Sequence, residues 1–172
     1  MWGLWLVLAS LVQAPPSEGV LVDKIVAVVN KDIIAWSEVK EAMASKPLRF
    51  LLSPQGAPKE GEILQYLIEN KLILQEVSYL SYLGTDPLEL EVALKHTMKN
   101  YPTEDEFRKT LEGNAISQEA LKGLLEPQLR GVEFIRRRNR FTADVQDPGV
   151  VLQLFEDWLK GLKEKADIQY PE

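Results

Sequence analysis

The stretch Val20–Met43, VLVDKIVAVVNKDIIAWSEVKEAM, constrains most strongly how this chain can fold. It predicts a β-hairpin over Val22–Trp36, with largely apolar faces on the first strand and a turn at Asn30–Asp32. Asn30 suits that turn because asparagine tolerates a positive φ. A two-stranded hairpin is only marginally stable alone in water, so we expect a further strand from elsewhere in the chain to pair with it.

The end of the chain offers that strand. Ala166, Ile168 and Tyr170 alternate with Asp167 and Gln169, which is the period of a half-buried strand. We therefore expect a small antiparallel sheet that joins the first ordered residues to the last.

The sequence between these strands has mainly helical periodicity. A first helix should begin with Ser37 as its N-cap. The clearest helix, Glu62–Tyr82, is apolar on more than one face and should be central, with Gly84 following its end. Thr85 or Asp86 should cap the next helix, which has Pro87 in its first turn.

Three further helix starts follow. Thr103 and Glu106 have the spacing of a capping box, which predicts a short helix that ends at Gly113. Ser117 should begin a helix with a long apolar stripe and a kink at Pro127. Asp147 and Pro148 are typical of an N-cap and first helical residue, and predict a closing helix. The fold class is thus mainly α, with a small antiparallel sheet.

The first 19 residues differ from the rest. The apolar run Trp2–Val12 is shorter than the ~20 residues needed to span a bilayer and is typical of a secretory signal peptide. Small residues at Ala14 and Gly19 provide two possible cleavage sites. An uncleaved membrane tether and a buried N-terminal helix are the alternatives. Residues 20–172 are then a single domain, in which 141–149 is a linker and 150–172 holds the closing helix and strand.

Composition excludes several kinds of function. The net charge of −6 disfavours nucleic acid as a partner, because phosphates attract basic surfaces. The chain has no cysteine, so it has no disulfide and no thiolate catalysis. Its single histidine, His96, lies between lysines, and a solvated or locally hydrogen-bonded side chain is favoured over a catalytic base. We therefore expect no catalytic residue, no cofactor and no metal site.

Arg136, Arg137, Arg138 and Arg140 form the strongest basic cluster. It is interpreted first as a charged helix end that favours its own carbonyls. Pairing with acidic neighbours such as Glu156, Asp157 or the glutamates of the first helix is the second interpretation. A nucleic-acid or anionic-lipid site is the third.

The segment SKPLRFLLSPQGAPKEGE is rich in proline and glycine, which break long elements. Its apolar side chains either pack onto the core or form a partly exposed patch. With Met43 they are the candidate peptide-binding residues: Met43, Leu48, Phe50, Leu51 and Leu52.

The stretch VDKIVAVVNKDIIAWSEV resembles the opening of the SurA-type periplasmic chaperones and their prolyl isomerase relatives. The match is carried by Val22, Asp23, Ala27, Val28, Val29, Asn30, Ser37 and Glu38. Leu67–Gly84 is similar to the central helix of that family and its exit. LEPQLRGVEFIRRRNRF and FEDWLKGLKEKADIQY are similar to the Arg-rich helix end and to the closing helix and strand.

The chain departs from the isomerases of that family in one respect. They carry one or two parvulin domains between the Arg-rich helix end and the closing helix, whereas residues 141–149 are too few for any folded domain. The resemblance therefore implies a periplasmic chaperone module that binds unfolded or extended envelope polypeptides and lacks isomerase activity. A fixed subunit or scaffold of an envelope assembly and a degenerate prolyl isomerase are the alternatives.

Overall fold

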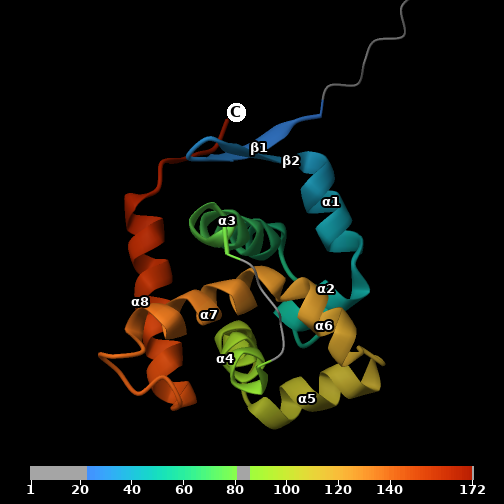
Figure 1. The fold of residues 1–172 in the computed structure, drawn as a ribbon. Coiled ribbons are helices and arrows are strands. Elements are labelled where there is room, and N and C mark those ends of the chain that lie inside the picture. The colour runs from blue at the N-terminus through green and yellow to red at the C-terminus, as the bar shows by residue number, and fades with distance from the viewer. Residues whose placement is uncertain (1–22, 81–85, 172) are drawn as a thin grey trace, which may run out of the picture.

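The computed structural model describes residues 23–80 and 86–171 (Figure 1). The expected signal peptide and the expected role of Gly84 fall outside these residues. Within them the chain forms eight α-helices, one short 3-10 helix and one three-stranded sheet. The predicted fold class, mainly α with a small antiparallel sheet, is confirmed.

The sheet joins the two ends of the described chain. Its strands are β1 (Ile25–Val29), β2 (Asp32–Ala35) and β3 (Ile168–Gln169), in the order β2-β1-β3. Both pairings are antiparallel, and Val29 lies opposite Asp32 on one side and Ile168 on the other. The expected pairing with the C-terminal strand is confirmed, although that strand is shorter than Ala166–Tyr170.

Asn30 connects the hairpin to two other parts of the molecule. It has the expected positive φ, 57°. Its backbone N–H donates to the Asp167 carbonyl at 2.7 Å, and its side-chain Oδ1 accepts from the Asp167 N–H at 3.0 Å. Its Nδ2 donates to Gln75 Oε1 at 2.7 Å. One turn residue thereby fastens β1 to the C-terminal strand and to the central helix.

The first three helices follow the hairpin: α1 (Trp36–Ala44), α2 (Lys46–Leu52) and α3 (Glu60–Val77). The prediction that Ser37 caps α1 is wrong, because the N-cap is Ala35. Ser37 instead donates its backbone N–H to the Asp23 carboxylate, at 3.2 Å to each oxygen. Hydrogen bonding to Ser37 lowers the pKa of Asp23. The α3 helix ends at Val77, before the expected Tyr82.

The later helices are α4 (Pro87–Thr97), the 3-10 turn η1 (Met98–Asn100), α5 (Glu104–Gly113), α6 (Gln118–Leu124), α7 (Glu126–Asn139) and α8 (Pro148–Lys165). Asp86, Thr103, Ser117 and Asp147 each accept a hydrogen bond at the predicted helix start. The kink predicted at Pro127 is wrong: the chain forms two helices there, and Pro127 lies in the first turn of the second. Proline suits that position because the first backbone N–H groups of a helix have no partner within it.

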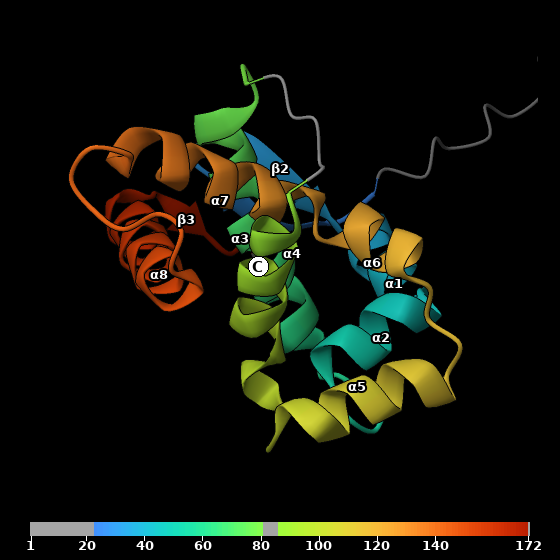
Figure 2. The same cartoon turned by 60° about the horizontal axis from the view of Figure 1, so that its bottom comes forward.

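Two hydrophobic clusters make up the core, and α3 contributes to both. The first contains Ile68 and Leu72 of α3 with the sheet, α1, α2, α5 and α6. The second contains Ile73 and Val77 of α3 with side chains of α4, α7 and α8. In Figure 2, α5 lies beside α2, and α4 extends from one end of α5 toward α7. Because α3 contributes to both clusters, the prediction that the Glu62–Tyr82 helix is central is confirmed.

Among the helices of residues 23–80 and 86–171, none has the length and hydropathy required of a membrane span. In the same residues, no group of three or more acidic, histidine or cysteine side chains is suitably placed to hold a metal ion.

Candidate functional site

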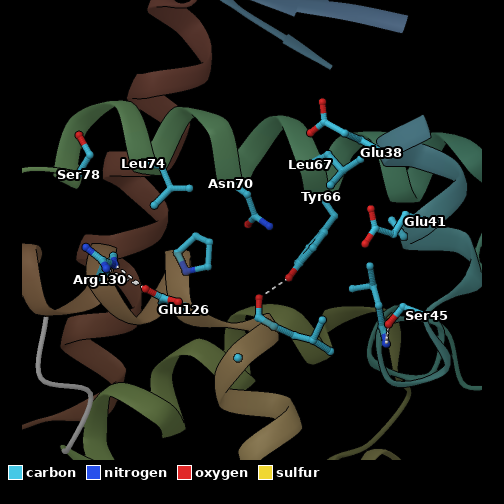
Figure 3. A pocket seen from close by; sticks show the side chains of 15 residues that line it. Glu38, Glu41, Ser45, Tyr66, Leu67, Asn70, Leu74, Ser78, Glu126 and Arg130 are labelled. Carbon is cyan, nitrogen blue, oxygen red and sulfur yellow. Dashed lines mark hydrogen bonds and ion pairs between the residues drawn. The ribbon is translucent and has the colours of Figure 1, made fainter. Parts of the chain in front are cut away.

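A cleft of about 730 Å³ opens between α1, α3 and the junction of α6 with α7 (Figure 3). The α3 helix forms one long wall with Tyr66, Leu67, Asn70, Leu74 and Ser78. These residues recur at the spacing of one helical face. The cleft is also lined by Glu38, Glu41, Ala42, Ser45, Leu48, Gly123, Leu124, Glu126, Pro127 and Arg130.

The floor of the cleft is held by Tyr66, which is 7% exposed. Its Oη donates a hydrogen bond of 2.5 Å to the carbonyl oxygen of Leu124, at the end of α6 (Figure 3). Burial raises the pKa of Tyr66, so its hydroxyl stays protonated and remains a donor well above neutral pH. This bond fixes the position of α6 against α3 and so determines the width of the cleft.

The break between α6 and α7 shapes the opposite wall. A continuous helix here would run past Pro127, whose ring would clash with the backbone of the preceding turn. The chain turns at Leu125 instead and exposes Gly123 and Leu124 toward α3. The cleft therefore combines apolar surface with amide, hydroxyl and carboxylate groups.

The predicted peptide-binding residues are divided between core and surface. Of the two interpretations of this segment, packing onto the core is confirmed for Leu48, Leu51 and Leu52, which are at most 6% exposed. Ser45 accepts a hydrogen bond from the Leu48 N–H and begins α2, an amphipathic turn that buries these leucines. Met43 is 37% exposed.

Phe50 is half-buried, and its ring lies against Gly56, where a Cβ atom would be only 2.5 Å from it. Of the predicted set, only Leu48 lines the cleft. A role for these five residues in peptide binding stays a prediction. The cleft residues on α3 were missed because periodicity shows that a helix is apolar on several faces but not which face is left open.

His96 lies in a buried junction of three helices, so the solvated one of its two expected situations, solvated or locally hydrogen-bonded, is wrong. It is 4% exposed. Its Nε2 is 3.6 Å from Glu69 Oε2 on α3, and its Nδ1 is 3.3 Å from Glu156 Oε1 on α8. Its ring also meets Phe155 edge to face, with centroids 5.1 Å apart. The structure shows a histidine oriented by two carboxylates.

Glu69 is the centre of this junction. It pairs with Lys163 of α8 and accepts a hydrogen bond from Gln65 at 3.3 Å. Burial raises the pKa of Glu69, but hydrogen bonds from His96 and Lys163 outweigh that effect and bring the pKa down to about 2. Glu69 is therefore a buried carboxylate that stays charged because three helices supply partners for it.

Two of the four arginines of the cluster, Arg136 and Arg137, form ion pairs. Arg136 pairs with Asp86 and with Glu89 of α4, the latter at 3.0 Å. Arg137 pairs with Glu133 one turn earlier. Pairing with acidic neighbours was the second interpretation, but the partners lie on α4 and α7 rather than at Glu156, Asp157 or on the first helix.

The surroundings of Glu89 and Asp86 shift the pKa values of the two carboxyl groups in opposite directions. Burial is the largest influence on the Glu89 carboxyl, and it raises the pKa. Burial also acts to raise the pKa of Asp86, but the hydrogen bond from Arg136 outweighs it and the pKa is lowered.

Comparison with known proteins gives one informative similarity. The chain is 31% identical over 125 residues to a protein named Chaperone SurA from Chromobacterium violaceum. The matched region covers 72% of this chain but only 28% of that protein's length. The similarity supports a distant relationship to SurA-like chaperones. No family model matches the chain, and no solved structure matches it.

Proposed function

We propose that this protein is an exported chaperone-like protein that binds unfolded or extended segments of envelope polypeptides in the cleft between α1, α3 and α6–α7. It does so without accelerating prolyl isomerisation. The proposal is carried by a single observation: an open cleft of about 730 Å³ with an apolar and amide-lined wall. The distant similarity to a chaperone supports it.

The chemistry of the cleft favours binding over turnover. Leu67 and Leu74 offer apolar contact, and Asn70 lies between them on the same wall of α3 (Figure 3). An extended segment presents alternating side chains and unpaired backbone groups, so apolar contacts and amide hydrogen bonds suit it. A segment held only by such non-covalent contacts can leave the cleft unaltered, as expected of a protein that keeps its clients from aggregating.

The first experiment measures suppression of aggregation. The purified domain, residues 20–172, is mixed with a denatured outer-membrane β-barrel protein that is diluted into buffer, and light scattering is recorded. We expect scattering to fall as the domain is added. Leu67→Gln should weaken this effect because it makes the cleft wall polar. Leu90→Gln is the matched control, since Leu90 is also half-buried against the first cluster but lies outside the cleft.

Equal suppression by both variants would place the binding surface elsewhere, and no suppression by the unaltered domain would overturn the proposal. If affinity capture from cells returned one stoichiometric partner rather than many clients, the protein would be a fixed subunit of an assembly. A proline-peptide exchange assay should show no acceleration. N-terminal sequencing of the protein from cells tests the proposed export.

A further inference from the structure

The charged groups of the cleft are strongly unequal in sign. Three carboxylates line it, Glu38 and Glu41 on α1 and Glu126 on α7, against one basic side chain, Arg130. The two acidic positions of α1 lie at one end of the cleft, and the pair of Glu126 and Arg130 lies at the other (Figure 3). An occupant therefore meets carboxylates at both ends of an apolar floor.

The one basic group is already engaged. Arg130 Nε and Nη2 donate to Glu126 Oε1 at 3.0 and 2.8 Å, and Nη1 donates to the Leu80 carbonyl at 3.1 Å. Each of the three guanidinium nitrogens of Arg130 thus donates to an acceptor within this chain. It has little capacity left to attract an acidic occupant.

The carboxylates of α1 differ from each other. Glu38 pairs with Lys71 at 3.3 Å and accepts from the Ala35 N–H at 3.2 Å. Glu41, in contrast, forms no ion pair with any other described residue, and its carboxylate points from α1 into the cleft (Figure 3). It is a fixed negative charge beside the apolar wall formed by Leu67 and Leu124.

Asn70 adds a group of a different kind midway along the cleft. Its Oδ1 accepts a 2.6 Å hydrogen bond from Gln128 Nε2, which orients the amide. The Asn70 side chain also lies within hydrogen-bonding reach of the Tyr66 hydroxyl. An amide nitrogen carries two N–H donors, so Asn70 is suited to meet a backbone carbonyl of an extended segment.

We propose that the cleft selects, among extended polypeptide segments, those that carry a lysine or arginine next to an apolar side chain. The apolar side chain packs on Leu67, Leu74 and Leu124, and the cation meets Glu41. This inference rests on the proposed function and specifies its substrate class. The occupant is a basic segment rather than a second copy of this chain, because the chain itself carries a net charge of −6.

The test uses three labelled peptides that share one apolar core and differ only in flanking residues, which are lysine, glutamine or glutamate. Fluorescence anisotropy gives each Kd. We expect the lysine peptide to bind about threefold to tenfold more tightly than the glutamine peptide, and the glutamate peptide to bind more weakly than both. The differences should shrink at about 0.5 M salt, where the Debye length is below about 5 Å.

Variants assign the effect to one side chain. Glu41→Gln should remove most of the lysine preference, so that the Kd of the lysine peptide comes close to that of the glutamine peptide. Glu112→Gln, which makes the same change of charge on α5 outside the cleft, should leave the preference intact. An equal loss in both variants would show that net charge alone is responsible and would overturn the inference.

Failure of the inference and failure of the proposed function are distinguishable. Equal Kd values for the three peptides would overturn the charge selection while polypeptide binding stands. Binding of a lysine peptide that lacks the apolar core with the same Kd would show a simple cation site and would also overturn it. If none of the peptides binds, both the proposed function and the inference fail.

Discussion

Carboxylates on the two sides of α3 differ in whether ion-pair partners surround them. Glu69 faces a junction with α4 and α8 and is 7% exposed, whereas its neighbour Asn70 faces the cleft. In the junction each carboxylate oxygen of Glu69 meets a partner, from His96 on one oxygen and Lys163 on the other. Across the cleft, Glu41 has no such partner among the described residues.

This difference separates charges that stabilise the fold from charges available to a ligand. A buried carboxylate is costly unless its partners are in place, so the junction ties α3, α4 and α8 into one arrangement. A charge at the edge of an open cleft costs little in water and can still attract an oppositely charged ligand. A glutamate therefore stabilises the fold on one side of α3, at Glu69, and is available to a ligand on the other side, at Glu41 across the cleft.

The largest expected effect on the unfolding free energy comes from replacing glutamate by leucine, once in the junction at Glu69 and once in the cleft at Glu41. Glu69→Leu leaves His96 and Lys163 without their shared carboxylate, and removing one partner of a buried ion pair costs roughly 3–5 kcal/mol of unfolding free energy. Glu41→Leu, in an exposed position, should change it by less than about 0.5 kcal/mol. Urea unfolding followed by circular dichroism measures both values. Similar losses in the two variants would contradict the distinction between junction and cleft.

The second prediction concerns pH. The folded-state pKa of Glu69, about 2, is below its ordinary value of 4.5, so its charged form stabilises the fold. This contribution is complete above pH 4.5 and is lost as the pH falls toward 2. At about 1.4 kcal/mol per pKa unit it amounts to roughly 3 kcal/mol.

Unfolding free energies of the unaltered protein and of Glu69→Gln, measured from pH 6 down to the acid transition, test this. The variant should lose less stability over that interval, because it has no carboxyl to protonate at position 69. Parallel curves would show that the junction does not depend on the charge of Glu69.

The smallest expected effect compares two glycines. A Cβ on Gly131 of α7 would lie 2.8 Å from Phe155 Cε2 and 3.0 Å from Trp158 Cζ3, so Gly131→Ala should destabilise by about 1–3 kcal/mol through overpacking. Gly123 of α6 lines the cleft, and nothing lies within 4 Å of its Cβ position. Gly123→Ala should therefore be neutral or stabilise by up to about 1 kcal/mol, as expected for a helix interior.

Thermal melts of these two variants provide the measurement. Opposite signs would support a tightly packed junction beside an open cleft. A clear loss of stability in Gly123→Ala would show that the cleft is narrower than the structure indicates.

Local signals in the sequence accounted for most helix starts. Asp86, Thr103, Ser117 and Asp147 cap the helices that they were expected to cap, because a cap depends only on a side chain and the backbone two or three residues later. The errors occurred where a distant group intervened. Ser37 was a reasonable cap, but the carboxylate that meets the start of α1 comes from Asp23, 14 residues earlier.

The candidate site was less predictable than the fold. An apolar segment near prolines left open whether its side chains pack on the core or form an exposed patch, and α2 places Leu51 and Leu52 in the first hydrophobic cluster. The cleft residues Tyr66 and Asn70 lie in the clearest helix, where nothing distinguished the open face from the buried one. The lysines beside His96 in sequence left a solvated or a locally hydrogen-bonded side chain open, and they gave no sign of the two carboxylates that surround it in space.

Local sequence patterns were enough to predict the mainly helical class, the caps at Asp86, Thr103, Ser117 and Asp147, and the pairing of the first hairpin with the last strand. Side-chain period and capping are properties of a few adjacent residues. The open face of α3, the pairing of the carboxylates and the partners of the arginines could be seen only in the folded molecule. They depend on how each helix is rotated against residues far away in sequence, such as Lys163 and Glu69, which are 94 positions apart, and no local pattern records that rotation.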